Sequence, residues 1–324
     1  EIMLTHDKIF VMGHKNPDAD CVGAALGIYR LSKALNKSTY IVMDKDCPAI
    51  EPIVDGIYRE RADEEEDIFV TNEEAMLLKD KSAMLIVVDV NVPATTECPE
   101  LLKSISTIVV LDHHRQSNET IKNAVVSYVE PYASSTCEMV AEILQYIVDK
   151  PKLKNIEADA MYSGILVDTD NFVIKAGVRT FEAASYLRRL GLNTADVKKL
   201  FNMNKEDYDH RADIVKTSKI IVSQIAVAKC YTKYPNIRVI ASQAADEMLN
   251  IGDIRASIVV YAQDGGVGIS ARSLGDINVQ LIMEYLGGGG HSTVAGAQVK
   301  DKNVDMVIED VEKAVFDYVA NNES

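Results

Sequence analysis

The sequence has no apolar run that approaches the roughly 20 residues of a membrane-spanning helix, and its start lacks the basic and apolar segments of a signal peptide. Cysteine is scarce: the five thiols are scattered, and none forms a Cys-x-x-Cys pair. These absences argue against a disulfide framework and fit a reducing cytosol. We therefore expect a cytoplasmic chain that makes no membrane contact of its own.

Positive charge is also in short supply, because 34 Lys and Arg residues face 49 Asp and Glu residues and give a formal net charge of −15 at pH 7. Binding of long nucleic acid requires a clustered basic surface, so this balance argues against such a partner. An anionic substrate would have to be held locally, by a metal ion or by arginine.

The length and the strand pattern predict an α/β protein of two domains. A chain of 324 residues, 47% hydrophobic and 26% charged, is too long for one compact core. Apolar runs alternate with helical stretches in the first part, which predicts a doubly wound, mostly parallel sheet. The later part predicts a smaller α/β domain with a mixed sheet and helices on one face. We place the first domain at 1–190, a helical linker at 191–222 and the second domain at 223–324.

Local patterns add detail. We expect a helix at 205–221, a strand at 237–241 and a hairpin turn at 264–266, where Asp-Gly-Gly separates two β runs. The acidic run at 63–67 is expected to be a solvated loop. Because the sequence starts with Glu1 rather than Met and its strand pattern begins almost at once, we expect a fragment of a longer protein.

Four clusters of acidic residues and histidines carry the chemistry of this chain. They are His14 with Asp18 and Asp20; Asp89; Asp112 with His113 and His114; and Asp168. Three clusters directly follow apolar runs at 8–12, 84–88 and 107–111, which are typical of buried parallel strands. Ligands of an open α/β sheet bind outside the carboxyl ends of the strands, so these clusters are expected to converge on one crevice. Taken singly, Asp18 and Asp20 are equally explained as helix caps, and Asp89 as a turn residue.

Charge balance favours a metal centre. Four carboxylates would lie in one crevice beside two histidines, and such charges repel strongly in a partly desolvated site unless cations join them. Two divalent ions would neutralise them, and a mixed set of carboxylate and imidazole ligands fits Mn²⁺ better than Mg²⁺ or structural zinc. A pair of such ions activates water and stabilises phosphoryl oxygens, which predicts phosphoester hydrolysis.

The Asp112-His113-His114 run predicts a division of roles between the two histidines. One ring would ligate metal, while its neighbour points elsewhere and donates a proton or polarises a phosphate oxygen. Asp112 would orient one of the two imidazole rings without binding the metal itself. The alternative is that the two histidines lie in a polar turn at the end of a strand and have no role in metal binding or catalysis.

The second domain carries four consecutive glycines before a histidine, namely Gly287, Gly288, Gly289, Gly290 and His291. A helix cap explains the first glycine but hardly all four. Consecutive glycines let backbone N–H groups approach an anion, and His291 or Arg272 would add charge and stacking. The alternative is that Arg272 is an ordinary exposed residue of a strand and contacts no ligand.

Together these motifs resemble the DHH/DHHA1 phosphoesterase superfamily, over nearly the whole chain and in that family's order. The motifs are His14-x3-Asp18-x-Asp20, Asp89, Asp112-His113-His114, Gly164-x3-Asp168-Thr169 and Gly287 to His291. The resemblance implies a DHH domain with two Mn²⁺ ions, for which Mg²⁺ or Co²⁺ would substitute, and a DHHA1 domain that binds substrate. The ligands it implies are His14 and Asp18 for one ion, Asp20, His113 and Asp168 for the other, and Asp89 between them. His114, with Asp112, is left for catalysis.

Within the superfamily, the stretches at 164–172, 179–184 and 290–298 look like those of GdpP-type cyclic-di-AMP phosphodiesterases. That resemblance implies hydrolysis of cyclic-di-AMP to linear pApA by metal-activated water, in a homodimer. It also implies a longer, membrane-anchored parent with sensory domains, in which this region faces the cytoplasm. The substrate contacts it suggests are Ser134, Ser135, Thr136, Asn171, Arg179, Arg272, Gly288, Gly289, Gly290 and His291.

Three other interpretations compete with this one. A nanoRNase-like DHH enzyme that cleaves linear dinucleotides would share the metal chemistry. A family II pyrophosphatase shares the first motifs but lacks the glycine-histidine loop. A non-catalytic cyclic-dinucleotide sensor would bind without turnover, and the presence of every expected ligand argues against it.

Overall fold

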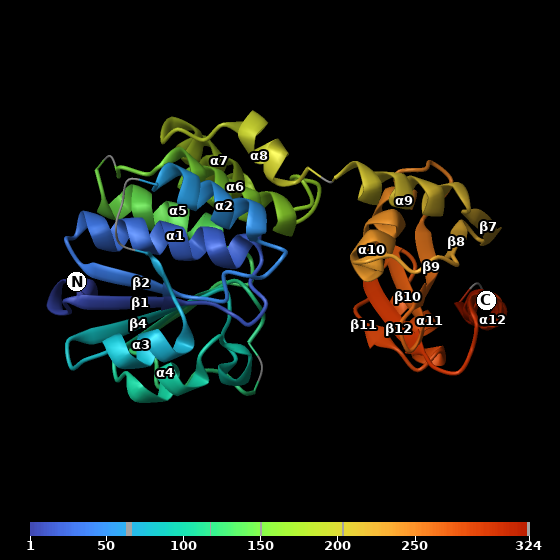
Figure 1. Cartoon of the computed structure of the whole chain (residues 1–324), viewed down its shortest axis with the longest axis horizontal. Helices are drawn as coiled ribbons and strands as arrows, with labels where there is room; N and C mark the ends of the chain where they lie inside the picture. The colour runs from blue at the N-terminus through green and yellow to red at the C-terminus, as the bar shows by residue number, and fades with distance from the viewer. Residues whose placement is uncertain (63–66, 117, 150, 203, 323–324) are drawn as a thin grey trace. The chain divides into compact units, whose positions relative to one another are not determined.

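The computed structural model describes residues 1–62, 67–116, 118–149, 151–202 and 204–322 (Figure 1). The chain divides into two compact units, Glu1–Asn202 and Met203–Ser324. Residues 63–66 of the acidic run that we expect to be a loop lie outside the described residues. Within the described ranges, no helix combines the length and the apolar character that crossing a membrane requires.

Unit 1 is built on a six-stranded sheet in the order β3-β2-β1-β4-β5-β6, and all of its strand pairs are parallel. This confirms the predicted doubly wound parallel sheet. Its strands are β1 (Lys8–Met12), β2 (Ser38–Val42), β3 (Phe69–Val70), β4 (Ala83–Val88), β5 (Ile108–Asp112) and β6 (Val126–Val129).

Helices cover both faces of this sheet. On one face lie α1 (Ala19–Ala34), α2 (Glu51–Glu60), α5 (Thr136–Ile147), α6 (Asn155–Asp168), α7 (Val178–Arg189) and α8 (Thr194–Leu200); on the other lie α3 (Asn72–Leu78) and α4 (Pro99–Ser104) (Figure 1). Short 3-10 helices span Ile2–Thr5 and Pro93–Thr95.

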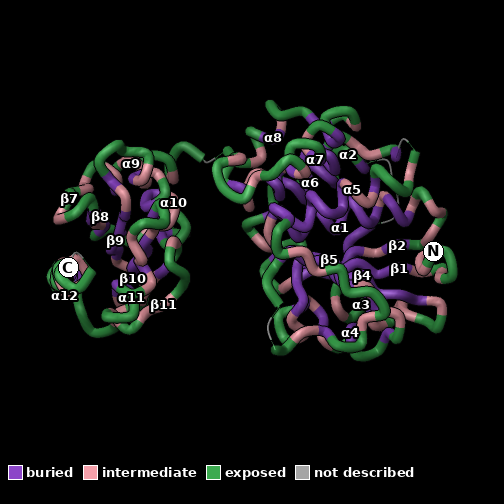
Figure 2. The backbone as a smooth tube through the Cα atoms, turned by 180° about the vertical axis from the view of Figure 1, so that it is seen from behind, coloured by how far each residue is buried: buried purple, intermediate pink, exposed green. Residues whose placement is uncertain are grey.

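Apart from Lys8 at the start of β1, the central strands β1 and β4 are apolar because both of their faces are buried (Figure 2). In β1, Ile9 and Val11 pack with α1 and α6, whereas Phe10 and Met12 pack on the opposite side with α3 and α4. This alternation follows from the two-residue period of a strand.

Helices α1 and α6 of unit 1 pack closely together. A Cβ atom added to Gly164 of α6 would lie 2.6 Å from the Cα of Asp20 and 2.8 Å from its Oδ1. A glycine at this position therefore lets the start of α1, with Asp20, approach the helix that ends at Asp168.

Unit 2 contains a second six-stranded sheet in the order β11-β12-β10-β9-β8-β7, which is mixed because β8 and β9 are parallel and the other pairs antiparallel. Its strands are β7 (Lys219–Val222), β8 (Ile225–Cys230), β9 (Ala256–Gln263), β10 (Gly266–Ser273), β11 (Gly289–Gly290) and β12 (Val294–Val299). Its helices are α9 (Lys205–Lys216), α10 (Ile237–Met248), α11 (Val279–Tyr285) and α12 (Val304–Asn322).

Three expectations for unit 2 are wrong in detail. Helices cover both faces of the sheet rather than one, since α9 and α10 pack on one core and α11 and α12 on another. The predicted strand at 237–241 is the start of α10, whose buried Ile237, Ile240, Ala241, Ala244 and Met248 follow a helical period. The predicted helix at 205–221 stops at Lys216, and β7 follows. The predicted hairpin at 264–266 is confirmed, with Gly265 and Gly266 at φ of 80° and 146°.

The predicted linker at 191–222 is divided between the two units. Helix α8 packs against α6 in unit 1, and α9 packs against α10 in unit 2. The described parts of this stretch therefore contribute to the units themselves.

Candidate metal centre

The topology of unit 1 brings the predicted clusters to one edge of the sheet. Strands β1, β4 and β5 are neighbours and parallel, so their carboxyl ends lie together. His14 follows β1, Asp89 directly follows β4, and His113 directly follows β5. Helix α1 begins after Asp18, and α6 ends with Asp168, at the same edge.

Six of these side chains form two adjoining groups, and the ligand atoms within each group lie within 4.8 Å of one another. The groups are His14 with Asp18 and Asp89, and Asp20 with His113 and Asp168. Asp89 faces both: its Oδ2 lies 3.4 Å from His14 Nε2, and its Oδ1 lies 3.5 Å from His113 Nε2. The structure thus brings together all six residues for which we predict metal binding.

Buried charge in this cluster fits a cation. The Nε2 atom of His113 is buried and makes no hydrogen bond among the described residues, although carboxylate oxygens of Asp168, Asp89 and Asp20 lie 2.9, 3.5 and 3.9 Å away. Imidazole nitrogens and carboxylate oxygens that point toward one another without a hydrogen bond are a donor set for a shared metal ion.

Electrostatics supports the same conclusion. Burial raises the pKa of Asp20 well above its ordinary value, and the charges of Asp89 and Asp168 raise it further. Burial likewise raises the pKa of Asp89 to about 6. Burial alone would lower the pKa of His14, but its contacts with Asp18 and Asp89 raise it to about 11. These carboxylates repel one another in a desolvated site, and a divalent ion would relieve that repulsion.

Asp18 has a second role that the sequence leaves open. It is the N-cap of α1, and its side chain accepts hydrogen bonds from the N–H groups of Asp20 and Cys21, both at 3.0 Å. The cap fixes Asp18 beside His14, whose Nε2 lies 3.8 Å from Asp18 Oδ1. Capping and participation in the cluster therefore coexist in one side chain.

His114 lies beside the cluster and is oriented by Asp112. The His114 Nδ1–H donates to Asp112 Oδ1 at 2.8 Å, and this hydrogen bond raises the pKa of His114. Asn91 in turn donates to the other oxygen, Asp112 Oδ2, at 2.5 Å. The side chain of His114 is 57% exposed, against 4% for His113. The two rings therefore differ in the way expected of one ligand and one reactive group.

A cavity of about 640 Å³ opens over this edge. Its walls include His14, Asp18, Asp89 and His114, together with Arg115. Arg115 is an exposed cation directly after His114, and sequence reasoning missed it. Its position next to the Asp-His-His motif is the only signal that the sequence offered.

Three predicted substrate contacts turn inward instead. Ser134, Ser135 and Thr136 are almost completely buried. Ser134 donates to Glu138, Ser135 caps α5 by accepting from the Glu138 N–H, and Thr136 donates to Asp89. Their hydroxyl groups are thus engaged within the protein.

Arg179 and Asn171, two other predicted substrate contacts, lie outside the cavity over the metal cluster. Arg179 pairs with Glu142 through Nε–Oε1 and Nη2–Oε2 contacts of 2.6 and 2.7 Å. Asn171 is exposed in a run with Asp170 and Phe172 in which all three residues have positive φ.

Unit 2 contains a separate pocket of about 840 Å³ around the glycine-histidine loop. Its lining includes Gly288, Gly289, Gly290, His291, Arg272 and Arg238. Two of the four glycines are needed for backbone packing: a Cβ at Gly288 would lie 2.2 Å from Gly296 O, and one at Gly290 would lie 2.5 Å from Val294 O. A Cβ at Gly287 or Gly289 would meet no atom within 4 Å.

The two arginines of this pocket differ in whether other residues hold their side chains. Arg272 is held by Asp246 (Nε–Oδ1 2.8 Å), by the backbone oxygen of Ala271 (3.0 Å) and by Ser242. Arg238, in the first turn of α10, is exposed and has no ionic or hydrogen-bond partner within the described part of the chain. Sequence reasoning names Arg272 and misses Arg238, which belongs to the segment at 237–241 for which we predict a strand.

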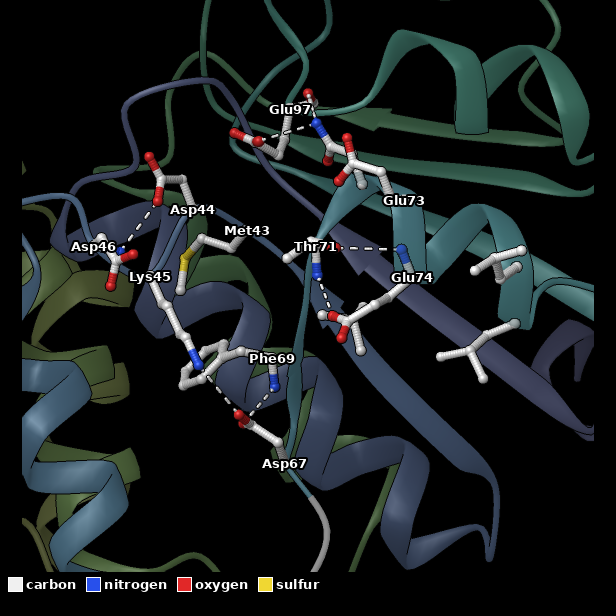
Figure 3. Close-up of a pocket in the computed structure, with 14 residues that line it drawn as sticks. Met43, Asp44, Lys45, Asp46, Asp67, Phe69, Thr71, Glu73, Glu74 and Glu97 are labelled. Carbon is white, nitrogen blue, oxygen red and sulfur yellow. Dashed lines mark hydrogen bonds and ion pairs between the residues drawn. The ribbon is translucent and has the colours of Figure 1, made fainter.

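Another hollow in unit 1, of about 660 Å³, lies beyond the ends of β2 and β3 (Figure 3). Acidic side chains surround it, but structural roles explain several of them. Lys45 pairs with Asp67, and Glu74 completes a capping box with Thr71 at the start of α3. We assign no function to this hollow.

Comparison with known protein families shows to which family the chain belongs. Residues 8–165 match the DHH family, N-terminal domain, and residues 218–317 match the DHHA1 domain. The chain therefore belongs to the DHH/DHHA1 family.

Two curated members of this family are similar to nearly the whole of this chain. The chain is 40% identical over 324 residues to the cyclic-di-AMP phosphodiesterase GdpP of Geobacillus thermodenitrificans, covering 98% of this chain and 48% of that protein. It is also 40% identical to the cyclic-di-AMP phosphodiesterase PdeA of Listeria monocytogenes, covering 94% and 46%. This chain thus spans about half the length of these curated relatives.

Two further similarities extend over whole proteins. The bifunctional oligoribonuclease and PAP phosphatase NrnA of Mycoplasma genitalium is 28% identical, covering 96% of this chain and 95% of that one. An exopolyphosphatase-related protein from Bacteroides fragilis has a TM-score of 0.77 at 18% identity, covering 100% and 96% of the two chains. At that identity the second similarity supports the fold alone.

Proposed function

We propose that this chain is the catalytic region of a metal-dependent phosphodiesterase that hydrolyses cyclic-di-AMP to linear pApA. The observation that carries the proposal is the pair of adjoining His and Asp groups that meet at Asp89. The substrate rests on the relatives named as cyclic-di-AMP phosphodiesterases, which match nearly the whole of this chain.

The donor set supports two divalent ions, with Mn²⁺ preferred. His14 and Asp18 would hold one ion, Asp20, His113 and Asp168 the other, and Asp89 would serve both. When bound, such a pair supplies activated water and neutralises charge on the phosphoryl oxygens.

The remaining steps belong to side chains of this protein. Asp112 keeps the proton of His114 on Nδ1, since that nitrogen donates to it. In its protonated form, His114 also has an N–H at Nε2, which would donate to a phosphate oxygen or protonate the 3′ oxygen that leaves. Arg115, in the same cavity, would bind a phosphate oxygen and hold the diester in place.

The pocket of unit 2 would recognise the nucleotide. Arg238, Arg272 and His291 gather there in a chain whose formal net charge is −15. An anionic ligand is the chemistry that the two guanidinium groups favour, and the imidazole of His291 can add a hydrogen bond.

A second candidate is cleavage of linear dinucleotides. The similarity to NrnA over nearly its full length favours it, because that relative is named an oligoribonuclease. The two candidates share the metal centre and differ in the substrate that is accepted.

One assay tests these proposals. The purified chain is incubated with cyclic-di-AMP, cyclic-di-GMP or pApA, with and without Mn²⁺, and the products are resolved by chromatography. We expect conversion of cyclic-di-AMP to pApA only with metal. Rapid turnover of pApA with cyclic-di-AMP untouched would favour the second candidate, and binding without turnover of any of them would indicate a sensor.

We also propose a homodimer, and a place for this region on the cytoplasmic side of a longer membrane-anchored protein. The edge strand β6 supports the dimer, because Val126 and Tyr128 are 39% and 37% exposed at the end of the sheet order. Sedimentation of the purified chain and of a Tyr128→Lys variant tests it: a parent that sediments as a monomer would remove this part of the proposal.

A further inference from the structure

The first residues of α5 bind carboxylates from both groups of the metal cluster. The backbone N–H of Thr136 donates to Asp20 Oδ2 at 2.7 Å, and the N–H of Cys137 donates to Asp20 Oδ1 at 2.8 Å. The side-chain hydroxyl of Thr136 donates to Asp89 Oδ1 at 3.1 Å. One residue thus contacts a carboxylate of one group and the carboxylate that both groups share.

The two contacts differ in kind. Asp20 is held by backbone N–H groups at a helix N-terminus, where the helix dipole also favours negative charge. Substitution of Thr136 by valine, serine or alanine leaves that backbone N–H in place. Asp89 is held by a hydroxyl group, which a substitution can delete without touching the backbone.

The hydroxyl acts on a residue whose backbone is already unusual. Asp89 has a φ of 59°, in the left-handed region that residues other than glycine seldom adopt. This backbone turn, directly after β4, directs the carboxylate between His14 and His113. The hydrogen bond from Thr136 fixes which oxygen, Oδ1, faces His113.

Helix capping does not account for the Thr136 hydroxyl. Ser135 is the N-cap of α5, and its side chain accepts the hydrogen bond from the Glu138 N–H at 3.1 Å. Thr136 is completely buried, so its hydroxyl does not serve solvent or substrate either. Among the described residues, the hydroxyl group of Thr136 hydrogen-bonds to Asp89 alone.

We propose that Thr136 is a positioning residue, whose hydroxyl holds Asp89 in the orientation that lets one carboxylate serve two metal ions. This rests on the proposed function, because it assumes the metal centre. Partners that orient metal ligands in this way contribute about 10- to 100-fold to metal affinity.

The test compares Thr136→Val, which deletes the hydroxyl and keeps the shape, with Thr136→Ser, which keeps the hydroxyl. Thr39→Val is the matched control, since Thr39 is a buried threonine of β2 whose hydroxyl donates to the backbone oxygen of Lys37. Each chelator-treated protein is titrated with Mn²⁺ by calorimetry, and the bound metal is examined by electron paramagnetic resonance for the coupling of two neighbouring ions.

We expect Thr136→Val to weaken Mn²⁺ binding by about 10- to 100-fold and to change the coupled spectrum, while Thr136→Ser and Thr39→Val stay close to the parent. Thermal unfolding without metal separates this from a general loss of stability. If valine prevents folding, Thr136→Ala deletes the same hydroxyl. Unchanged affinity and an unchanged spectrum in a folded hydroxyl-deletion variant would overturn the proposal. A parent that binds no Mn²⁺ would instead refute the metal centre itself.

Discussion

The metal cluster of unit 1 and the pocket of unit 2 hold opposite charges in opposite ways. At the cluster, Asp20 and Asp89 are almost completely buried and are fixed by hydrogen bonds from α5. In the pocket, the guanidinium group of Arg238 is exposed. Buried like charges repel unless an ion joins them, so their geometry must be built in beforehand. An exposed cation is stabilised by water whether or not an anion is bound, so its geometry need not be built in beforehand and it binds an anion with less geometric precision.

The largest effect should come from the carboxylate at the centre of the cluster. Asp89→Asn and Asp89→Ala both remove a negative charge that faces two histidines. We expect loss of metal and activity below detection, since even partners outside the metal ligands cost about 10- to 100-fold in affinity. Metal content by atomic absorption and hydrolysis of cyclic-di-AMP measure this.

Two comparisons keep that result specific. Asparagine tolerates the left-handed backbone of Asp89 better than alanine does, so a defect confined to the alanine variant would point to backbone strain. Asp264→Ala, in the pocket of unit 2, should leave metal content unchanged. Full activity in Asp89→Asn would contradict the role of Asp89 between two ions.

The next largest effect separates histidines of the two regions. His114→Ala should keep its metal and lower kcat by about 100- to 10,000-fold, because it removes a general acid or phosphate contact and no predicted ligand. His291→Ala should mainly raise KM, since it lines the pocket of unit 2. Steady-state kinetics at saturating Mn²⁺ distinguish the two, and a His114→Ala protein without metal would make that histidine a ligand instead.

The two regions also differ in how much the sequence revealed. The edge of unit 1 was predictable because apolar runs of five or six residues mark parallel strands, and parallel strands bring their carboxyl ends together. The roles of Thr136 and Arg238 were not predictable. The first depends on a hydrogen bond between residues 47 positions apart. The second depends on the segment from Ile237 being a helix, and a short apolar run does not distinguish helix from strand.

A buried acid elsewhere in unit 1 offers a reference for the metal cluster. Asp159 of α6 is buried, accepts a hydrogen bond from the Asn193 N–H at 2.8 Å, and belongs to none of the His and Asp groups found among the described residues. Burial raises its pKa to about 6. The folded protein therefore favours the protonated acid, and the stability that Asp159 contributes is fully present below about pH 4 and is lost as the pH rises through 6.

Asp159→Asn tests this, because asparagine keeps the hydrogen-bond acceptor and does not ionise. Relative to the variant, the parent should lose up to about 3 kcal/mol of unfolding free energy between pH 4 and pH 7.5. Urea unfolding followed by circular dichroism, with chelator present, measures the difference at each pH. A constant difference between parent and variant would show that Asp159 stays ionised, and that burial alone does not perturb acids in this unit.

The smallest effect concerns the two arginines of the unit 2 pocket. Arg238→Ala should raise KM for cyclic-di-AMP by about 10- to 100-fold, the value of one or two hydrogen bonds to a charged group, and leave unfolding unchanged because no described residue holds this side chain. Arg272→Ala should instead lower the unfolding midpoint, because it releases Asp246 and Ser242.

The control is Arg255→Ala, because the side chain of Arg255 pairs with Asp276 away from this pocket. Calorimetric titration of the chelator-treated proteins with pApA gives the affinity without turnover. Equal affinities of the parent and Arg238→Ala would mean that this exposed, unpaired arginine does not contact the ligand. Arg272, which its neighbours hold in place, would then be the residue that binds the anion. The pocket of unit 2 would in that case resemble the cluster of unit 1, where buried and fixed carboxylates are expected to bind metal.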